Sequence, residues 1–448
     1  MYRRKEDSYM PYLKKALSRW DSVAVITAIV IGVGIFRVPA EVAKFLKSPP
    51  LMLIAWFLGG MISLLGALCY AELSSSFPKT GGNYVYLRES YGKWAAFLFG
   101  WTEVLVIRAG SIAAIAFISA EYLRSLLSIN IFFIKPLAIF IVLALSLINI
   151  FGLSCGKKIH NLLTVINISA LVSIILFGII SRKGNSSHFH PAAFPLDKNI
   201  LSPIGLALIP ILWTYGGWHE NTFVAEETRD AARTLPRALT AGVCLITVLY
   251  LAVNFLYIYL MPVTEMANSA LIGSDVFYIL YRTAGRKIFE MVVVIASLGS
   301  ISAMIITGSR ITYAMAKDNA VFAYIEKISA RYGTPHRAII INAVWASILI
   351  LLGTFAKLLF FTGILVWLFF ALAVAGIFIL RRKFPAIERP YKVWGYPATP
   401  AIFILVCAIL FVNTIVFNPV PSVVGLCLLA SGIPVYFVSK LLEKKEKT

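Results

Sequence analysis

Long apolar runs separated by short polar segments dominate the 448-residue chain. A helix needs about 20 mostly apolar residues to cross the ~30 Å hydrocarbon layer of a bilayer. Twelve runs approach or exceed this length, and we predict one membrane span in each: residues 22–45, 51–73, 95–123, 136–153, 161–180, 201–224, 238–261, 288–314, 338–355, 358–380, 398–417 and 421–440. An even number of spans would place both termini on the same side of the membrane.

The composition supports a polytopic, all-helical membrane protein. Hydrophobic residues make up 59% of the chain and charged residues only 14%, whereas soluble domains average about 25% charged. Residues 1–21 have no compact apolar segment followed by a cleavage site, so we interpret them as a retained cytoplasmic tail. The polar connections are too short for a soluble catalytic domain, and no GxxxxGK[ST] phosphate loop occurs. ATP-driven transport is therefore excluded.

The basic charge follows the expected topology. The formal net charge is +20, and 27 of the 41 Lys and Arg residues fall in the tails and loops that lie on the same side as the amino terminus. Cytoplasmic loops carry such an excess, so we expect both termini in the cytoplasm and the chain in a plasma (bacterial inner) membrane. No nucleic-acid partner is needed. The five cysteines are scattered, and neither a metal site nor a cofactor is predicted.

The first span contains an unusual stretch, ITAIVIGVGIFRVPAEV, over residues 26–42. Gly32, Val33 and Gly34 lie near the middle of the membrane, and each glycine costs a helix about 0.8–1 kcal/mol relative to alanine. One interpretation is a helix that is broken so that freed backbone groups bind a solute. The alternative is that small residues allow another helix to pack closely, which is common in membrane bundles.

The sixth span repeats this feature in Thr214-Tyr215-Gly216-Gly217-Trp218. Spans one and six each begin a group of five spans, so the second group would cross the membrane in the opposite direction. Broken helices at corresponding positions form the substrate site of inverted-repeat transporters. We therefore predict a first repeat at residues 22–200, a second repeat at 201–380, two further helices at 381–440 and a cytoplasmic tail at 441–448.

The chemistry of two broken helices indicates their ligand. Helix amino ends present unpaired N–H groups, which suit a carboxylate, and carboxyl ends present unpaired carbonyls, which suit an ammonium group. A site with both ends fits an α-amino acid. The aromatic side chains near the breaks either close over the substrate or pack in the core, and both interpretations stay open for Phe36, Trp213, Tyr215 and Trp218.

Five segments resemble the amino acid–polyamine–organocation superfamily, and within it the L-type amino acid transporters and their bacterial relatives. These segments are IGVGIFRVPAEV, AELSSSFPKTGGNYVYLRESYG, GWTEVLVIRAGS, LWTYGGWHENTFVAEETRDAARTLPRAL and GSRITYAMAKDN. The resemblance implies a five-plus-five inverted-repeat (LeuT-like) fold with two further helices, and amino acid transport by alternating access. It implies carboxylate contacts from the backbone N–H groups of Gly32, Val33 and Gly34, ammonium contacts from the carbonyls of Val30, Trp213 and Gly216, and an aromatic lid at Trp213; Gly217 completes the second break.

The sequence departs from this family at three places. Val33 stands where serine is common, which removes a hydroxyl but keeps the backbone donors. Asn167 stands in the fifth span where the family commonly carries a lysine involved in ion or proton coupling, so the coupling mode is open. Animal members bond to a glycoprotein heavy chain through a cysteine after span three, and residues 124–135 contain none. We therefore expect no covalent heavy-chain partner.

Charged and titratable side chains inside spans are candidates for coupling or gating, because a buried charge in the membrane requires a partner. Glu103 and Arg108 are five residues apart, about 140° around an ideal helix, so we expect each to meet another span. His219 and Glu220 lack the second histidine of an HExxH zinc site, but the histidine could carry a proton. Structural ion pairs are the alternative role for these charges.

Together these features predict a secondary transporter of neutral amino acids, working as an exchanger or a proton symporter. A cationic amino acid or polyamine transporter is the alternative within this class. A channel and an intramembrane enzyme are the alternatives from other classes, and no catalytic motif supports the enzyme.

Overall fold

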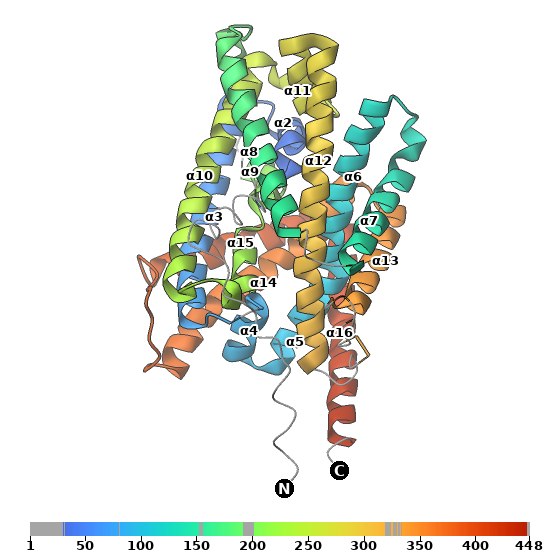
Figure 1. Ribbon diagram of the computed structural model, residues 1–448. Helices are drawn as coiled ribbons and strands as arrows, with labels where there is room; N and C mark the ends of the chain where they lie inside the picture. The colour runs from blue at the N-terminus through green and yellow to red at the C-terminus, as the bar shows by residue number, and fades with distance from the viewer. Residues whose placement is uncertain are drawn as a thin grey trace.

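The computed structural model describes residues 30, 32–79, 81–151, 156–190, 201–318 and 334–445, together with 324, 325, 329 and 332. All regular elements in these ranges are helices, stacked side by side in a bundle (Figure 1). They are η1 (Val33–Phe36), α2 (Val38–Leu46), α3 (Pro49–Ser76), α4 (Asn83–Tyr91), α5 (Lys93–Thr102), η2 (Glu103–Arg108), α6 (Ala109–Leu127), η3 (Ile131–Phe133), α7 (Ile134–Phe151), α8 (Gly156–Ile180), η4 (Ser186–Phe189), α9 (Leu201–Tyr215), η5 (Trp218–Glu227), α10 (Ala231–Leu260), α11 (Val263–Asn268), α12 (Ile272–Asp318), α13 (His336–Leu352), α14 (Phe355–Lys383), α15 (Ala398–Phe417) and α16 (Pro419–Lys445).

Eight helical stretches in the described part of the chain are long and apolar enough to cross a membrane. They correspond to α3, α5–η2–α6, η3–α7, α10, α12, α14, α15 and α16. The prediction of a polytopic helical membrane protein is thus confirmed. Three of the other predicted spans coincide with shorter or interrupted elements, namely η1 and α2, α9 with η5, and α13, and the fifth predicted span coincides with the 25-residue helix α8.

Small residues allow α3 to pack closely against two neighbours. A Cβ atom on Gly59 would lie 2.4 Å from Ile211 of α9, and one on Gly60 would lie 2.4 Å from Thr247 of α10. Real Cβ atoms do not approach other atoms this closely, so a side chain at either position would force its neighbour to move. Close backbone approach through small residues is the usual way in which membrane helices pack.

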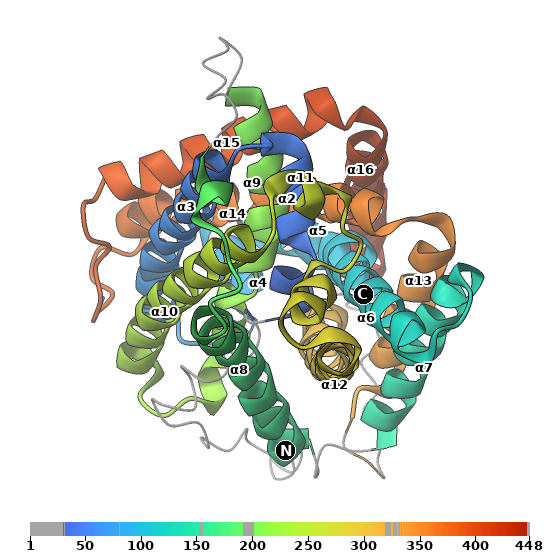
Figure 2. The same cartoon turned by 90° about the horizontal axis from the view of Figure 1, so that it is seen from above.

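Helices from the first half of the chain pack against helices from the second half. α2 contacts α9, α3 contacts α10, α6 contacts α12, and α7 contacts α13. Both views show the last three pairs side by side, with α15 and α16 towards the outer edge of the bundle (Figures 1 and 2). The bundle interior therefore lies between α2, α3, α9 and α10 on one side and α6, α7, α12 and α13 on the other.

Two interruptions of helical geometry face this interior. Gly32 has extended backbone angles, with φ −85° and ψ −174°, and the 3₁₀ helix η1 and then α2 follow it. α9 ends at Tyr215, and Gly217 adopts the left-handed region with φ 99° before η5 begins. A residue with a side chain would be strained at Gly217. The interruptions fall at the two glycine pairs; the part of the first span before Val30 lies outside the described residues.

Candidate functional site

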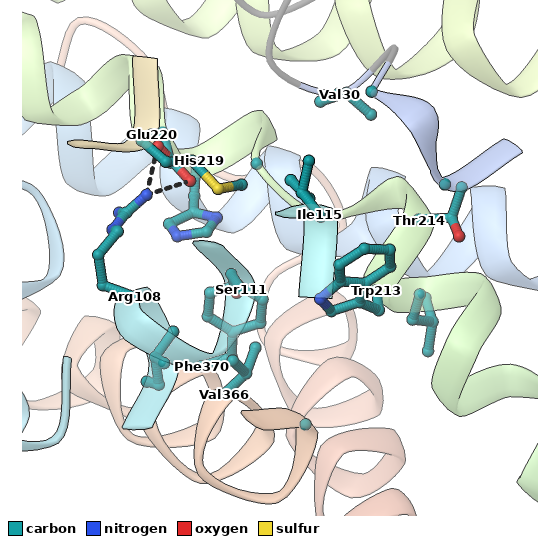
Figure 3. Close-up of a pocket in the computed structure, with 18 of the residues that line it drawn as sticks. Val30, Arg108, Ser111, Ile115, Trp213, Thr214, His219, Glu220, Val366 and Phe370 are labelled. Atoms are coloured by element: carbon teal, nitrogen blue, oxygen red, sulfur yellow. Dashed lines mark hydrogen bonds and ion pairs between the residues drawn. The ribbon is translucent and has the colours of Figure 1, made fainter. Parts of the chain in front are cut away.

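A pocket lies where the two interruptions meet (Figure 3). It contains about 780 Å³ of empty space, including the part that is open to solvent. Of the residues predicted for the substrate site, seven line it: Val30, Gly32, Val33, Gly34, Trp213, Gly216 and Gly217. Of the predicted coupling or gate residues, Glu103, Arg108, His219 and Glu220 also line it.

Direct contacts join the two interruptions. A Cβ atom on Gly34 would lie 3.0 Å from the Thr214 side chain and 3.2 Å from the Trp213 ring, so the absence of a side chain lets η1 lie against α9. The hydroxyl of Tyr250, on α10, lies 2.6 Å from the Val30 carbonyl and 3.3 Å from the Thr214 carbonyl. Tyr250 therefore holds together the backbone on the two sides of the pocket.

The backbone carbonyls at the pocket differ in whether they are free to accept a hydrogen bond from a ligand. The Val30 carbonyl accepts hydrogen bonds from Tyr250 Oη and from the Gly32 N–H, both at 2.6 Å. These two donors match the two lone pairs of a carbonyl oxygen. The Trp213 carbonyl accepts a bond from the Gly216 N–H at 3.0 Å. Trp213 and Gly216 are therefore better placed than Val30 to accept a bond from a ligand.

The aromatic side chains near the breaks divide into one that lines the pocket and three that do not. Trp213 lines it beside Ile115 (Figure 3). The interpretation of Tyr215 as a site residue is not supported, because its ring packs against Trp56 and Tyr250 and its hydroxyl donates to the Trp56 carbonyl at 3.1 Å. Trp218 packs on Tyr70 and Phe370, and Phe36 packs on Phe289.

The charged side chains that line the pocket form one cluster. Arg108 lies 2.8 Å from Glu103 Oε1, and its Nη1 lies 3.0 Å from both carboxylate oxygens of Glu220. The expectation that Glu103 and Arg108 do not pair with each other is wrong, because residues 103–108 form a π-helix. Its i→i+5 bonding brings residues five apart to the same face. The expectation of a partner on another span is correct for Arg108, which reaches Glu220 of η5.

The side chains of His219 and Glu220 contact different groups although the two residues are adjacent in sequence. Glu220 bonds to Arg108 and accepts a bond from Thr307 Oγ1 at 3.2 Å. The imidazole of His219 instead contacts aromatic rings, with Phe370 at a centroid distance of 4.8 Å. The two side chains therefore do not act as a pair. Asn167 falls within α8, but its side chain lies outside the described residues.

Sequence reasoning missed half of the pocket lining. The missed residues come mainly from α6, α12 and α14 and are Ile107, Ser111, Ile115, Leu212, Thr214, Met304, Gly363, Val366, Trp367 and Phe370. Most are apolar side chains in apolar helices, where nothing distinguishes a pocket-facing position from a core position. Ser111 and Thr214 are exceptions, since a hydroxyl in a membrane span is a recognisable signal. In the described part of the chain, no group of three His, Cys, Asp or Glu residues is placed to hold a metal ion.

Comparison with known proteins identifies the family. The profile of the amino acid permease family matches residues 17–438. The chain belongs to this family. The family consists of membrane transporters, so this permease is a transporter and not an enzyme.

Three relatives of the permease align over nearly its whole length. The human large neutral amino acids transporter small subunit 2 is 30% identical over 97% of this chain and 82% of its own. The human b(0,+)-type amino acid transporter 1 is 29% identical over 95% of this chain and 88% of its own. The serine/threonine exchanger SteT of Bacillus subtilis (strain 168) is 27% identical over 96% of this chain and 97% of its own. Their names differ in substrate, so the permease is an amino acid transporter whose preferred side chain the comparisons leave open.

Proposed function

We propose that the permease is a secondary transporter that binds an α-amino acid in the pocket between the two interrupted helices and carries it across the membrane by alternating access. The observation that carries this proposal is the meeting of both glycine pairs at one pocket. The backbone N–H groups of Val33 and Gly34 would bind the carboxylate. The carbonyls of Trp213 and Gly216 would bind the ammonium group, and the Trp213 ring would cover the substrate.

Neutral amino acids fit this pocket best. The charged side chains that line it are Glu103, Arg108 and Glu220, and Arg108 bonds to both carboxylates. Neither acid is therefore unpaired and available for a cationic substrate. A cationic amino acid or polyamine transporter remains the alternative, because two carboxylates share one guanidinium.

The packing of the helices supports a five-plus-five inverted repeat within twelve spans. If residues 22–200 and 201–380 are the repeats, spans one, two, three and four correspond to six, seven, eight and nine. The helices that contact each other are these counterparts: α2 with α9, α3 with α10, α6 with α12, and α7 with α13. A pseudo-two-fold axis between the halves accounts for this pairing. Residues 381–440 would add the two outer helices, between the cytoplasmic tails 1–21 and 441–448.

We further propose that the protein lies in a plasma (bacterial inner) membrane with both termini in the cytoplasm, as the distribution of Lys and Arg favours. It would work without a covalent heavy chain, because residues 124–135 contain no cysteine. Coupling is by exchange or by protons. The candidate residues are Asn167, where a coupling lysine is absent, and the pocket residues His219, Glu220, Glu103 and Arg108.

Counterflow in proteoliposomes tests this function. Vesicles preloaded with unlabelled amino acid should accumulate external radiolabelled amino acid much faster than empty vesicles, because an exchanger reorients only when loaded. A proton symporter would instead respond to an inward pH gradient in empty vesicles. Flux of amino acid that needs neither internal substrate nor a gradient and shows no saturation would indicate a channel and contradict the proposal.

A further inference from the structure

We propose that the end of the pocket formed by α6, η5 and α14 is a polar subsite that selects amino acids with a neutral hydroxyl or carboxamide side chain, namely Ser, Thr, Asn and Gln, over apolar ones. Trp367 and His219 would be the residues that determine this specificity. The inference rests on the proposed function, because it takes the pocket to be the substrate site. It adds the side-chain class, which the relatives leave open.

Trp367 supplies an unused donor. It lies on α14, is 4% exposed and lines the pocket, and its Nε1 has no hydrogen-bond partner among the described residues. An indole N–H can only donate. A Cβ atom on Gly363, one turn earlier, would already lie 3.7 Å from Nε1, so the glycine keeps the space beside this atom open. A substrate oxygen placed there would satisfy the donor.

His219 supplies a second unused polar atom in the lining of the same pocket. Its buried Nδ1 also has no partner in the described part of the chain. Both rings contact Phe370, His219 at a centroid distance of 4.8 Å and Trp367 at 6.1 Å. Figure 3 shows His219 near Ser111, on the side of the pocket away from Thr214. An imidazole nitrogen donates or accepts according to its tautomer, so this end of the pocket suits a group that does both.

The charge at this end narrows the choice of side chain. Glu103 and Glu220 surround Arg108, so the acids outnumber the base and disfavour Asp or Glu as substrates. A lysine or arginine substrate carries only donors. It would leave the Trp367 N–H unpaired and would place a second cation near Arg108. Hydroxyl and carboxamide groups carry both a donor and an acceptor without charge, and they alone satisfy both unused atoms.

Two pairs of substrates with matched shapes test the subsite: threonine against valine, and asparagine against leucine. We expect threonine and asparagine to inhibit uptake and to stabilise the purified protein at concentrations about tenfold lower than valine and leucine, since one hydrogen bond to an otherwise unsatisfied buried donor has about this effect. Trp367→Phe keeps an aromatic ring at this position, although a smaller one, and removes the N–H. It should bring the threonine-to-valine ratio close to one, because threonine loses a hydrogen bond that valine does not make.

Trp94→Phe is the matched control, because Trp94 is 51% exposed and does not line the pocket; the ratio should stay as in the parent. His219→Phe should change the ratio in the same direction as Trp367→Phe. If the parent binds valine as tightly as threonine, or if Trp367→Phe leaves their ratio unchanged, the subsite is wrong while amino acid transport stands. If no amino acid binds or is transported, the proposed function itself fails.

Discussion

Replacing Gly216 by valine should abolish amino acid uptake although the protein still inserts into the membrane. A Cβ atom at this position would lie 2.8 Å from the Trp213 carbonyl oxygen, a backbone atom that cannot rotate away. That carbonyl is one of the proposed ammonium acceptors, and the Gly216 N–H donates to it at 3.0 Å. Losing a hydrogen bond to a charged group costs roughly 10- to 100-fold in affinity. Uptake of radiolabelled amino acid at low concentration should fall by at least this factor.

Ala430→Val is the control for adding a branched side chain to a membrane helix. Ala430 is exposed on α16, away from the pocket, and its substitution should leave uptake unchanged. The amounts of both variants in the membrane are measured in parallel, so that a folding defect is separated from a binding defect. Parent-like uptake by Gly216→Val would show that the second interruption is not part of the substrate site.

Replacing Arg108 by methionine should strongly destabilise the folded protein. The guanidinium is the partner of two buried carboxylates, Glu103 and Glu220. Removing one member of a buried ion cluster leaves unpaired charge and costs about 3–5 kcal/mol. This cost corresponds to a fall of roughly 3–5 °C in the midpoint of thermal unfolding for a chain of this length, measured on purified protein in detergent.

Glu220→Gln is the informative comparison. The amide keeps the shape of the carboxylate and an acceptor for Arg108 and Thr307, and Glu103 remains as a one-to-one partner of the guanidinium. We expect a much smaller loss of stability than for Arg108→Met. Equal unfolding midpoints for Arg108→Met and the parent would show that the cluster does not contribute to the stability of the fold. Its charges would then have only a functional role.

The helices and their interruptions could be predicted because each has a local cause. Lipid requires about twenty apolar residues for each crossing, and paired glycines weaken a helix wherever they occur. The structure accordingly leaves helical geometry at Gly32 and near Gly217. Glycine also allows close packing of another helix here, since Gly34 lets η1 lie against Thr214 and Trp213. Close packing and a break therefore occur together.

The pairing of Glu103 with Arg108 could not be predicted from ideal helix geometry. An ideal α-helix has 3.6 residues per turn and separates residues five apart by about 140°, whereas the local π-helix brings them to the same face. The orientation of Tyr215, by contrast, could have been inferred. Residues two apart in a helix differ by about 200°, so a helix that turns Trp213 towards the pocket turns Tyr215 away from it.

The residues of α14 that line the pocket could not be predicted from the sequence for a different reason. Trp367 and Phe370 belong to a 29-residue apolar helix, and lipid, core and pocket all accept apolar side chains. No periodic pattern therefore identifies the face that lines the pocket. Only the fold reveals that the Trp367 N–H lacks a partner among the residues that the structure describes, and this observation is the basis of the proposed polar subsite.

The central claim is that the pocket recognises both ends of an α-amino acid through the backbone of the two interrupted helices. The most direct test compares three ligands by thermal stabilisation of the purified protein, which reports binding of millimolar ligands. They are the amino acid that stabilises most, the corresponding amine without the carboxylate, and the corresponding 2-hydroxy acid without the ammonium group. The account predicts that each analogue binds at least about tenfold more weakly. Stabilisation by either analogue at the same concentration as the amino acid would contradict it.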